Sequence, residues 1–166
     1  MTASDILIDG FTRVHDVVHR HVEGLDLDTL TFRADPEANT IAWLVWHLSR
    51  GQDAQVTDAL GGDEVWPAFA GRFALPFPLG ANGYGHTSAD VAAVRVEAPL
   101  LLEYLDAVHA RTVALLASVS DGDLERIVDE RWDPPVTLAV RLVSVLSDDL
   151  QHAGQVGYVK GLAERA

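Results

Sequence analysis

Two histidines and a pair of neighbouring aspartates are the residues of this chain best suited to chemistry. In the segment SDDLQHAGQ, His152 follows Asp148 by four residues, so both side chains lie on one side of a helix, and Asp149 lies on its inward stripe. His47 lies within the apolar face of an earlier predicted helix. A carboxylate with two imidazoles suits zinc, nickel or iron(II), and a divalent cation would compensate the burial of a carboxylate. The pattern indicates a metal site between two helices.

Arrangements without a metal also fit these residues. His47 could form a hydrogen bond to an aspartate of the later helix, as most inward-facing histidines do with some core partner. Arg141 or Arg50 could neutralise the aspartates in an ion pair. Spacing within the sequence leaves both alternatives open.

A second histidine pair is an alternative candidate for a metal site. The segment VHDVVHRH places His15 and His19 four residues apart, a spacing that lets two imidazoles share a metal. Both fall off the apolar stripe of their helix, with Asp16 and Arg20 beside them. We interpret them as solvated surface histidines.

Four long helices are expected to position these residues, because apolar side chains recur at helical spacing in four segments and no run of strands stands out. The first begins at Thr2, and the second follows Asn39 or Thr40 as its cap. The third runs from near Glu97 to about residue 118, and the fourth from Thr137 to about Lys160. The predicted fold class is all-α, a four-helix bundle.

The segment from residue 61 to residue 86 interrupts this pattern. It contains six glycines and three prolines, interleaved with aromatic residues, and it predicts a long loop between the second and third long helices. A short helix capped by Thr87 follows it. We expect this loop to supply the apolar wall of a substrate pocket through four aromatic side chains: Phe69, Phe73, Phe77 and Tyr84.

Composition narrows the class of protein. The 166 residues are 48% hydrophobic and 22% charged, which predicts one globular domain over residues 1–166. The net charge of −13 argues against nucleic acid and anionic membranes as partners. No signal peptide or long apolar run is present, so we expect a cytoplasmic protein. The chain has no cysteine, and any thiol in its chemistry must be a co-substrate.

Three segments carry a resemblance to a known family: NTIAWLVWHLSRGQD, GYGHTSADV and DDLQHAGQVGYVKGL. With them the chain resembles the DinB-like superfamily of metal-binding four-helix bundles, which includes mycothiol-dependent maleylpyruvate isomerases and mycothiol and bacillithiol S-transferases. The resemblance implies that His47, Asp148 and His152 are the metal ligands. The usual pattern on the last helix is histidine, three residues, histidine. Asp148 departs from it, and Asp149 is the alternative ligand.

The resemblance also implies an activity. We expect a metal-dependent transferase or isomerase in which a mycothiol-like, low-molecular-weight thiol attacks an electrophile. Zinc is the first candidate for the metal, with nickel or iron as alternatives. His86, Gln151 and Gln155 are candidate contacts of the thiol or substrate, and no catalytic residue is assigned. The alternative is a stress-response protein that binds a metal or small ligand without turnover. Whether the chain forms a homodimer stays open.

Overall fold

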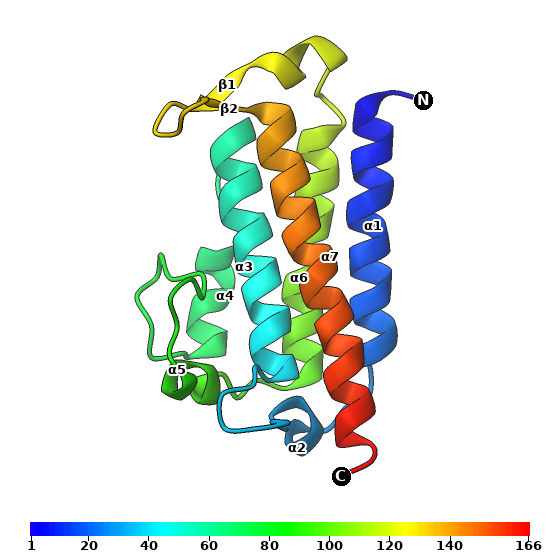
Figure 1. Cartoon of the computed structure of the whole chain (residues 1–166), viewed down its shortest axis with the longest axis vertical. Helices are drawn as coiled ribbons and strands as arrows, with labels where there is room; N and C mark the ends of the chain where they lie inside the picture. The colour runs from blue at the N-terminus through cyan, green and yellow to red at the C-terminus, as the bar shows by residue number, and fades with distance from the viewer.

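Four long helices form the body of the protein in the computed structural model, which describes all residues from 1 to 166 (Figure 1). They are α1 (Ala3–Val22), α3 (Ile41–Leu60), α6 (Ala98–Leu116) and α7 (Leu138–Ala163). Helix α3 packs against α6 and α7, and α1 packs against the same two helices. The α3–α7 seam and the α1–α6 seam therefore lie on opposite sides of the bundle. The four predicted long helices are confirmed.

Threonine caps set where these helices begin. The side chains of Thr2, Thr40, Thr87 and Thr137 each accept a hydrogen bond from the backbone N–H three residues later, as predicted. This bond satisfies one of the amides that the first helical turn leaves unpaired. Helix α6 starts without a side-chain cap, and proline in its first turn fits there because no intrahelical N–H is needed.

Two apolar clusters hold the helices together. The larger centres on α3 and includes Leu44, Trp46 and Tyr104, all almost fully buried. The smaller lies at the other end of the bundle around Phe11 and Leu142. Burial of each such side chain stabilises the fold by about 1.5–3 kcal/mol. The rigid α3–α7 pairing that results is the support for the candidate site.

The connections between the long helices are more structured than the sequence predicted. The segment expected to be a continuous loop contains the helix α4 (Trp66–Phe73), and α5 (Ser88–Ala93) follows it. The prediction of one uninterrupted loop was wrong because Pro67 lies at the start of α4, where proline is favourable. A short helix, α2 (Leu27–Leu30), connects α1 to α3.

A small hairpin was also not predicted. After the 3-10 helix η1 (Asp121–Glu125), strand β1 (Ile127–Asp129) pairs antiparallel with β2 (Val136–Thr137). Strands of two and three residues are too short to show an alternating pattern, so only the folded chain reveals them. No helix combines the length and apolar character needed to span a membrane.

Candidate metal centre

The α3–α7 seam brings together His47, Asp148 and His152. One ligand atom from each lies within 4.8 Å of the others. The Nε2 atom of His152 is 3.5 Å from Oδ1 of Asp148, and the rings of His47 and His152 have centroids 4.9 Å apart at 70°. Asp149 is not part of this group, so the structure favours Asp148 over the alternative ligand.

Each imidazole is held through its other nitrogen. Nδ1 of His47 forms a short hydrogen bond with the backbone carbonyl of Asn82, and Nδ1 of His152 is 2.8 Å from Oε1 of Gln155. Because both partners are oxygen acceptors, we assign the proton to Nδ1 in both rings. Both Nε2 lone pairs are then free, which is the arrangement of histidines that ligate metals.

The segment after α4 approaches His47 closely. Gly83 has a φ of +98°, and a Cβ atom there would collide with the His47 ring. Glycine is required for both reasons. Trp43 stacks on His47 with centroids 4.5 Å apart and planes at 19°, and a Cβ atom at Gly83 would also lie 3.1 Å from this indole ring. The imidazole therefore packs against both the indole ring of Trp43 and the backbone at Gly83.

The donor set fits a divalent transition metal. Bond lengths of 2.0–2.1 Å around a tetrahedral zinc place neighbouring ligand atoms about 3.3 Å apart. The observed 3.5 Å between His152 and Asp148 matches this spacing with little rearrangement. Three protein ligands leave at least one coordination position open, as in catalytic rather than structural zinc sites.

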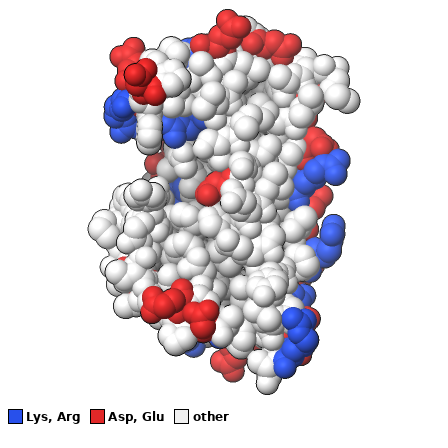
Figure 2. Space-filling view, in the orientation of Figure 1, with Lys and Arg blue, Asp and Glu red and all other residues white.

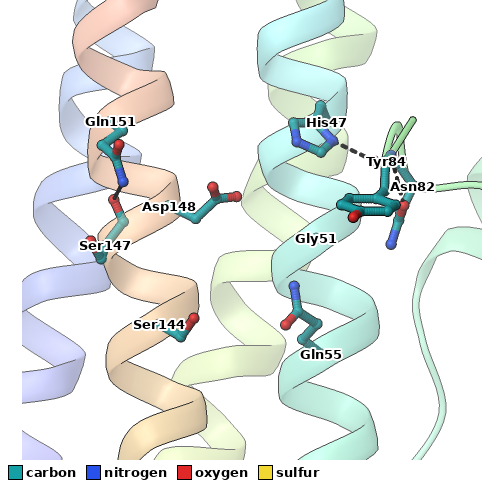
Figure 3. Close-up of a pocket in the computed structure, with 9 residues that line it drawn as sticks. All are labelled: His47, Gly51, Gln55, Asn82, Tyr84, Ser144, Ser147, Asp148 and Gln151. Atoms are coloured by element: carbon teal, nitrogen blue, oxygen red, sulfur yellow. Dashed lines mark hydrogen bonds between the residues drawn. The ribbon is translucent and has the colours of Figure 1, made fainter. Parts of the chain in front are cut away.

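A pocket of about 480 Å³ opens beside these ligands (Figure 3). His47 and Asp148 face it from α3 and α7, and Gln151 lies along its edge, so two predicted ligands and one predicted contact residue meet here. His86 does not line it. The remaining lining residues are mostly small or polar: Gly51, Gln55, Asn82, Tyr84, Ser144 and Ser147.

The expected apolar wall is absent from this pocket, apart from the exposed Tyr84. Phe69 and Phe73 are buried against Tyr104. Phe77 packs on His86 with ring centroids 4.5 Å apart. The prediction was wrong for the three phenylalanines because packing their rings against other aromatic side chains is more favourable than exposing them to a polar pocket.

His86 has a structural partner instead of a place in the pocket. Its Nδ1 accepts a hydrogen bond of 3.1 Å from the indole N–H of Trp43, and its ring stacks on Trp46. Because Trp43 itself stacks on His47, the hydrogen bond to His86 helps to fix the indole ring that packs against this candidate ligand.

The two aspartates differ in how their charges are accommodated. Asp149 is 1% exposed, and its Oδ2 atom has no hydrogen-bond partner. Burial, reinforced by the neighbouring charge of Asp148, raises the pKa of Asp149 well above its usual range. Burial therefore favours the neutral, protonated form of Asp149 over the charged one.

The arginines considered as partners of these aspartates are used elsewhere. Arg141 pairs with Asp129 at 2.9 Å, and Arg50 pairs with Asp53 and Glu64. The ion-pair alternative is thus contradicted.

Burial also prepares His47 for metal binding. Loss of solvent lowers the pKa of His47 below its usual 6.5, outweighing the opposing effect of the hydrogen bond to Asn82, and the nearby His152 lowers it further. The neutral imidazole that a metal requires is therefore favoured at neutral pH.

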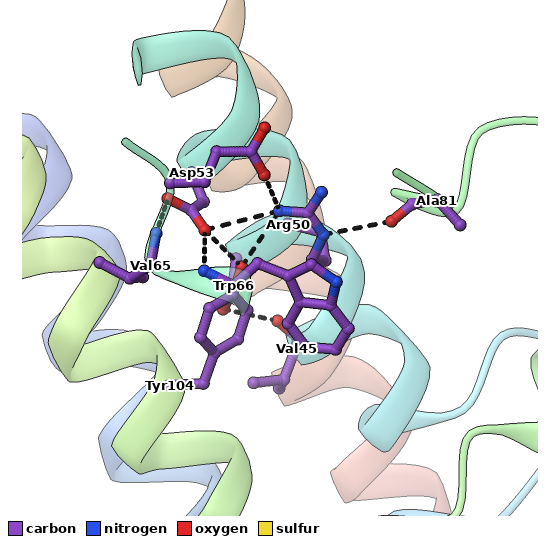
Figure 4. Close-up of polar contacts among 9 residues, drawn as sticks. Val45, Arg50, Asp53, Val65, Trp66, Ala81 and Tyr104 are labelled. Atoms are coloured by element: carbon purple, nitrogen blue, oxygen red, sulfur yellow. Dashed lines mark hydrogen bonds and ion pairs between the residues drawn. The ribbon is translucent and has the colours of Figure 1, made fainter. Parts of the chain in front are cut away.

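A buried polar network anchors the chain segment that contacts His47 (Figure 4). Arg50 donates to the carbonyl of Ala81 at 3.1 Å, next to the residue whose carbonyl holds His47. Asp53 accepts hydrogen bonds from the backbone N–H groups of Val65 and Trp66 at the start of α4. This network fixes both ends of the segment between α3 and the site. Sequence analysis missed it, since its partners are far apart in the chain.

The rival histidine pair is not free in solvent. The side chains of His15 and His19 are 22% and 30% exposed, and Nε2 of each lies within hydrogen-bond distance of Oδ1 of Asp106 on α6. The interpretation as solvated surface histidines was wrong because α6 supplies a carboxylate that the sequence of α1 does not reveal.

The fold agrees with the comparisons with known proteins. A model of the DinB superfamily matches residues 11–156, so the chain belongs to this superfamily. Among solved structures, the chain is similar to the crystal structure of a conserved protein from Enterococcus faecalis, with 29% sequence identity and a TM-score of 0.92. That match covers 100% of this chain and 99% of the other. No curated protein matches the chain. The family predicted from three short segments is confirmed.

Proposed function

We propose that this protein is a divalent-metal-dependent transferase or isomerase that uses a low-molecular-weight thiol. The observation that carries the proposal is the group formed by His47, Asp148 and His152, with both Nδ1 atoms held by oxygen acceptors. Such a group is suited to a metal with an open position. Zinc is the first candidate, and the DinB superfamily includes metal-dependent thiol transferases.

A metal at this position would bind the thiol sulfur and stabilise its thiolate form. The chain itself has no cysteine, so the sulfur must come from a second molecule. His47 and His152 are oriented by Asn82 and Gln155, and Asp148 adds a negative charge that balances the cation. The protein thus supplies ligation and orientation, and the thiol supplies the nucleophile.

The pocket favours a polar thiol such as mycothiol. Gln55, Ser144 and Gln151 offer hydrogen-bond donors and acceptors to hydroxyl or amide groups along its length (Figure 3). A volume of about 480 Å³ lies in the range of small-molecule sites. Exposed Tyr84 provides the one aromatic surface against which an electrophile could pack.

The test combines metal content with turnover. Purified protein without an affinity tag is analysed for bound metal, then mixed with a polar low-molecular-weight thiol and monochlorobimane. We expect bound metal and thiol-dependent consumption of the bimane, and His47→Ala should lose one metal ion per chain together with all consumption of the bimane. His21→Ala serves as a matched control because His21 lies outside the group. Full metal content in His47→Ala would refute the site.

The second candidate function is metal or small-ligand binding without turnover, as in a stress-response protein. It is favoured by the pocket's lack of an apolar wall for a hydrophobic electrophile. Stoichiometric metal that depends on His47, with no thiol-dependent consumption of any electrophile tested, would select this function over the enzyme.

A further inference from the structure

The α1–α6 seam, opposite the candidate metal centre, holds a second group of two imidazoles and one carboxylate. His15 and His19 lie one turn apart on α1, and Asp106 faces them from α6. Their ligand atoms also lie within 4.8 Å of one another. The Nε2 atoms of His15 and His19 are 2.8 and 2.6 Å from the same oxygen, Oδ1 of Asp106.

The hydrogen-bonding pattern of His15 calls for a cation. Its Nδ1 is 3.1 Å from Oδ1 of Asp16 and its Nε2 is 2.8 Å from Oδ1 of Asp106, whereas a neutral imidazole has one proton to donate. Whichever nitrogen lacks the proton presents its lone pair to a carboxylate oxygen. Two electron pairs at these distances repel unless a positive charge lies between or beside them. Either an added proton or a metal ion satisfies this arrangement.

The group is also oriented as a ligand site would be. His109 stacks on His15 with centroids 4.6 Å apart and planes at 26°, much as Trp43 stacks on His47 in the first site. Oδ1 of Asp16 lies 3.1 Å from Nδ1 of His15, in the position that the Asn82 carbonyl occupies beside Nδ1 of His47. Stacking and an outer hydrogen bond together fix the direction in which Nε2 points.

We propose that His15, His19 and Asp106 bind a second divalent transition-metal ion that links α1 to α6. Two imidazoles select zinc, cobalt, nickel or copper over magnesium and calcium, which prefer oxygen ligands. The ligand atoms must separate from 2.6–2.8 Å to about 3.3 Å to surround such an ion. The side chain of Asp106 is 52% exposed, so it can rotate to make this room.

This site is independent of the proposed function. None of its three ligands lines the pocket beside His47, and the two sites lie on opposite seams of the bundle. A metal here binds the folded state and not separated helices, so it stabilises the bundle in proportion to its occupancy. The second metal would stabilise the packing of α1 against α6, whereas a metal at the first site would bind the thiol.

The experiment measures zinc bound to full-length, untagged protein that has been stripped with a chelator and titrated with zinc chloride. We expect two zinc ions in the parent protein, one in His47→Ala, and none in the double variant His47→Ala/His19→Ala. His47→Ala/His21→Ala is the matched control and should retain one zinc. Zinc should raise the melting temperature of His47→Ala but not that of His47→Ala/His19→Ala.

Asp106→Asn in the His47→Ala background is a second variant that keeps the shape of the side chain, and circular dichroism checks that each variant is folded. It should also lose the remaining zinc. Two results overturn the inference: no zinc in folded His47→Ala, or one zinc that survives both His19→Ala and Asp106→Asn. A single zinc in the parent that is lost in His19→Ala and kept in His47→Ala would instead support this site and refute the proposed function's metal centre.

Discussion

Replacing Asp53 with asparagine should destabilise the protein through the network that supports the site. Asp53 is 2% exposed and is surrounded by hydrogen-bond donors (Figure 4). Its Oδ2 atom lies 2.9 Å from the Tyr104 hydroxyl, 2.9 Å from the N–H of Trp66 and 3.5 Å from Arg50. Its Oδ1 atom accepts from Val65 at 3.1 Å. Burial raises the pKa of Tyr104, so its hydroxyl remains a donor.

The size of the effect follows from this count of donors. Asparagine keeps one oxygen and places an NH₂ group where the other acceptor was, so at least one buried donor loses its partner. A buried donor without an acceptor costs about 1–3 kcal/mol, and the charge-assisted bond to Arg50 contributes about 1.5–3 kcal/mol. Because Arg50 keeps Glu64 at 2.9 Å, its charge is not left alone. We therefore expect a loss of about 3–5 kcal/mol in the free energy of unfolding.

Urea denaturation followed by circular dichroism measures this loss, which corresponds to a decrease in melting temperature of about 6–20 °C for a chain of this size. Arg72→Gln is the matched control: it breaks an ion pair with Glu103 in which both side chains are about half exposed, and should cost at most about 1 kcal/mol. Hydrogen exchange in Asp53→Asn should accelerate first in residues 62–82. A loss no larger than that of Arg72→Gln would refute the anchoring role of the network.

Three further predictions concern the metal centre. Gly83→Ala should weaken zinc binding, measured by calorimetric titration, because the added Cβ atom would displace His47. Gly80→Ala is the control, since a Cβ atom there meets nothing within 4 Å and zinc affinity should match that of the parent. Equal zinc affinities in the two variants would contradict the prediction. Gln155→Ala should weaken zinc about 10–100-fold by releasing His152, and unchanged affinity would show that the ring needs no such partner. Because burial lowers the pKa of His47 below 6.5, zinc release to a chromophoric chelator should begin only below that pH, and full release at higher pH would refute it.

The four long helices were determined by the sequence alone. Apolar spacing marks the buried faces of the long helices, and threonines mark the beginnings of α1, α3 and α7, because both signals act within one or two turns of chain. On α7 the predicted inward residues Leu142, Val145, Asp149 and Val156 are all buried. The same local signals placed His47 and His152 on two helix faces, although their approach across the α3–α7 seam is known only from the folded chain.

The contacts that orient the histidines of both candidate sites were decided by the tertiary structure. The carbonyl of Asn82 reaches His47 from 35 residues away, and Asp106 reaches His19 from 87 residues away. Neither contact can be recognised in the sequence. Every residue has a backbone carbonyl, so the amino-acid type of Asn82 does not reveal its bond to His47, and a single aspartate on an exposed helix face is common in any protein. The phenylalanines of the segment after α3 are a case in which the sequence suggested a role that tertiary packing contradicts. Their composition suggested a pocket wall, and packing against Tyr104 placed two of them in the core, since burial of aromatic area outweighs any local preference.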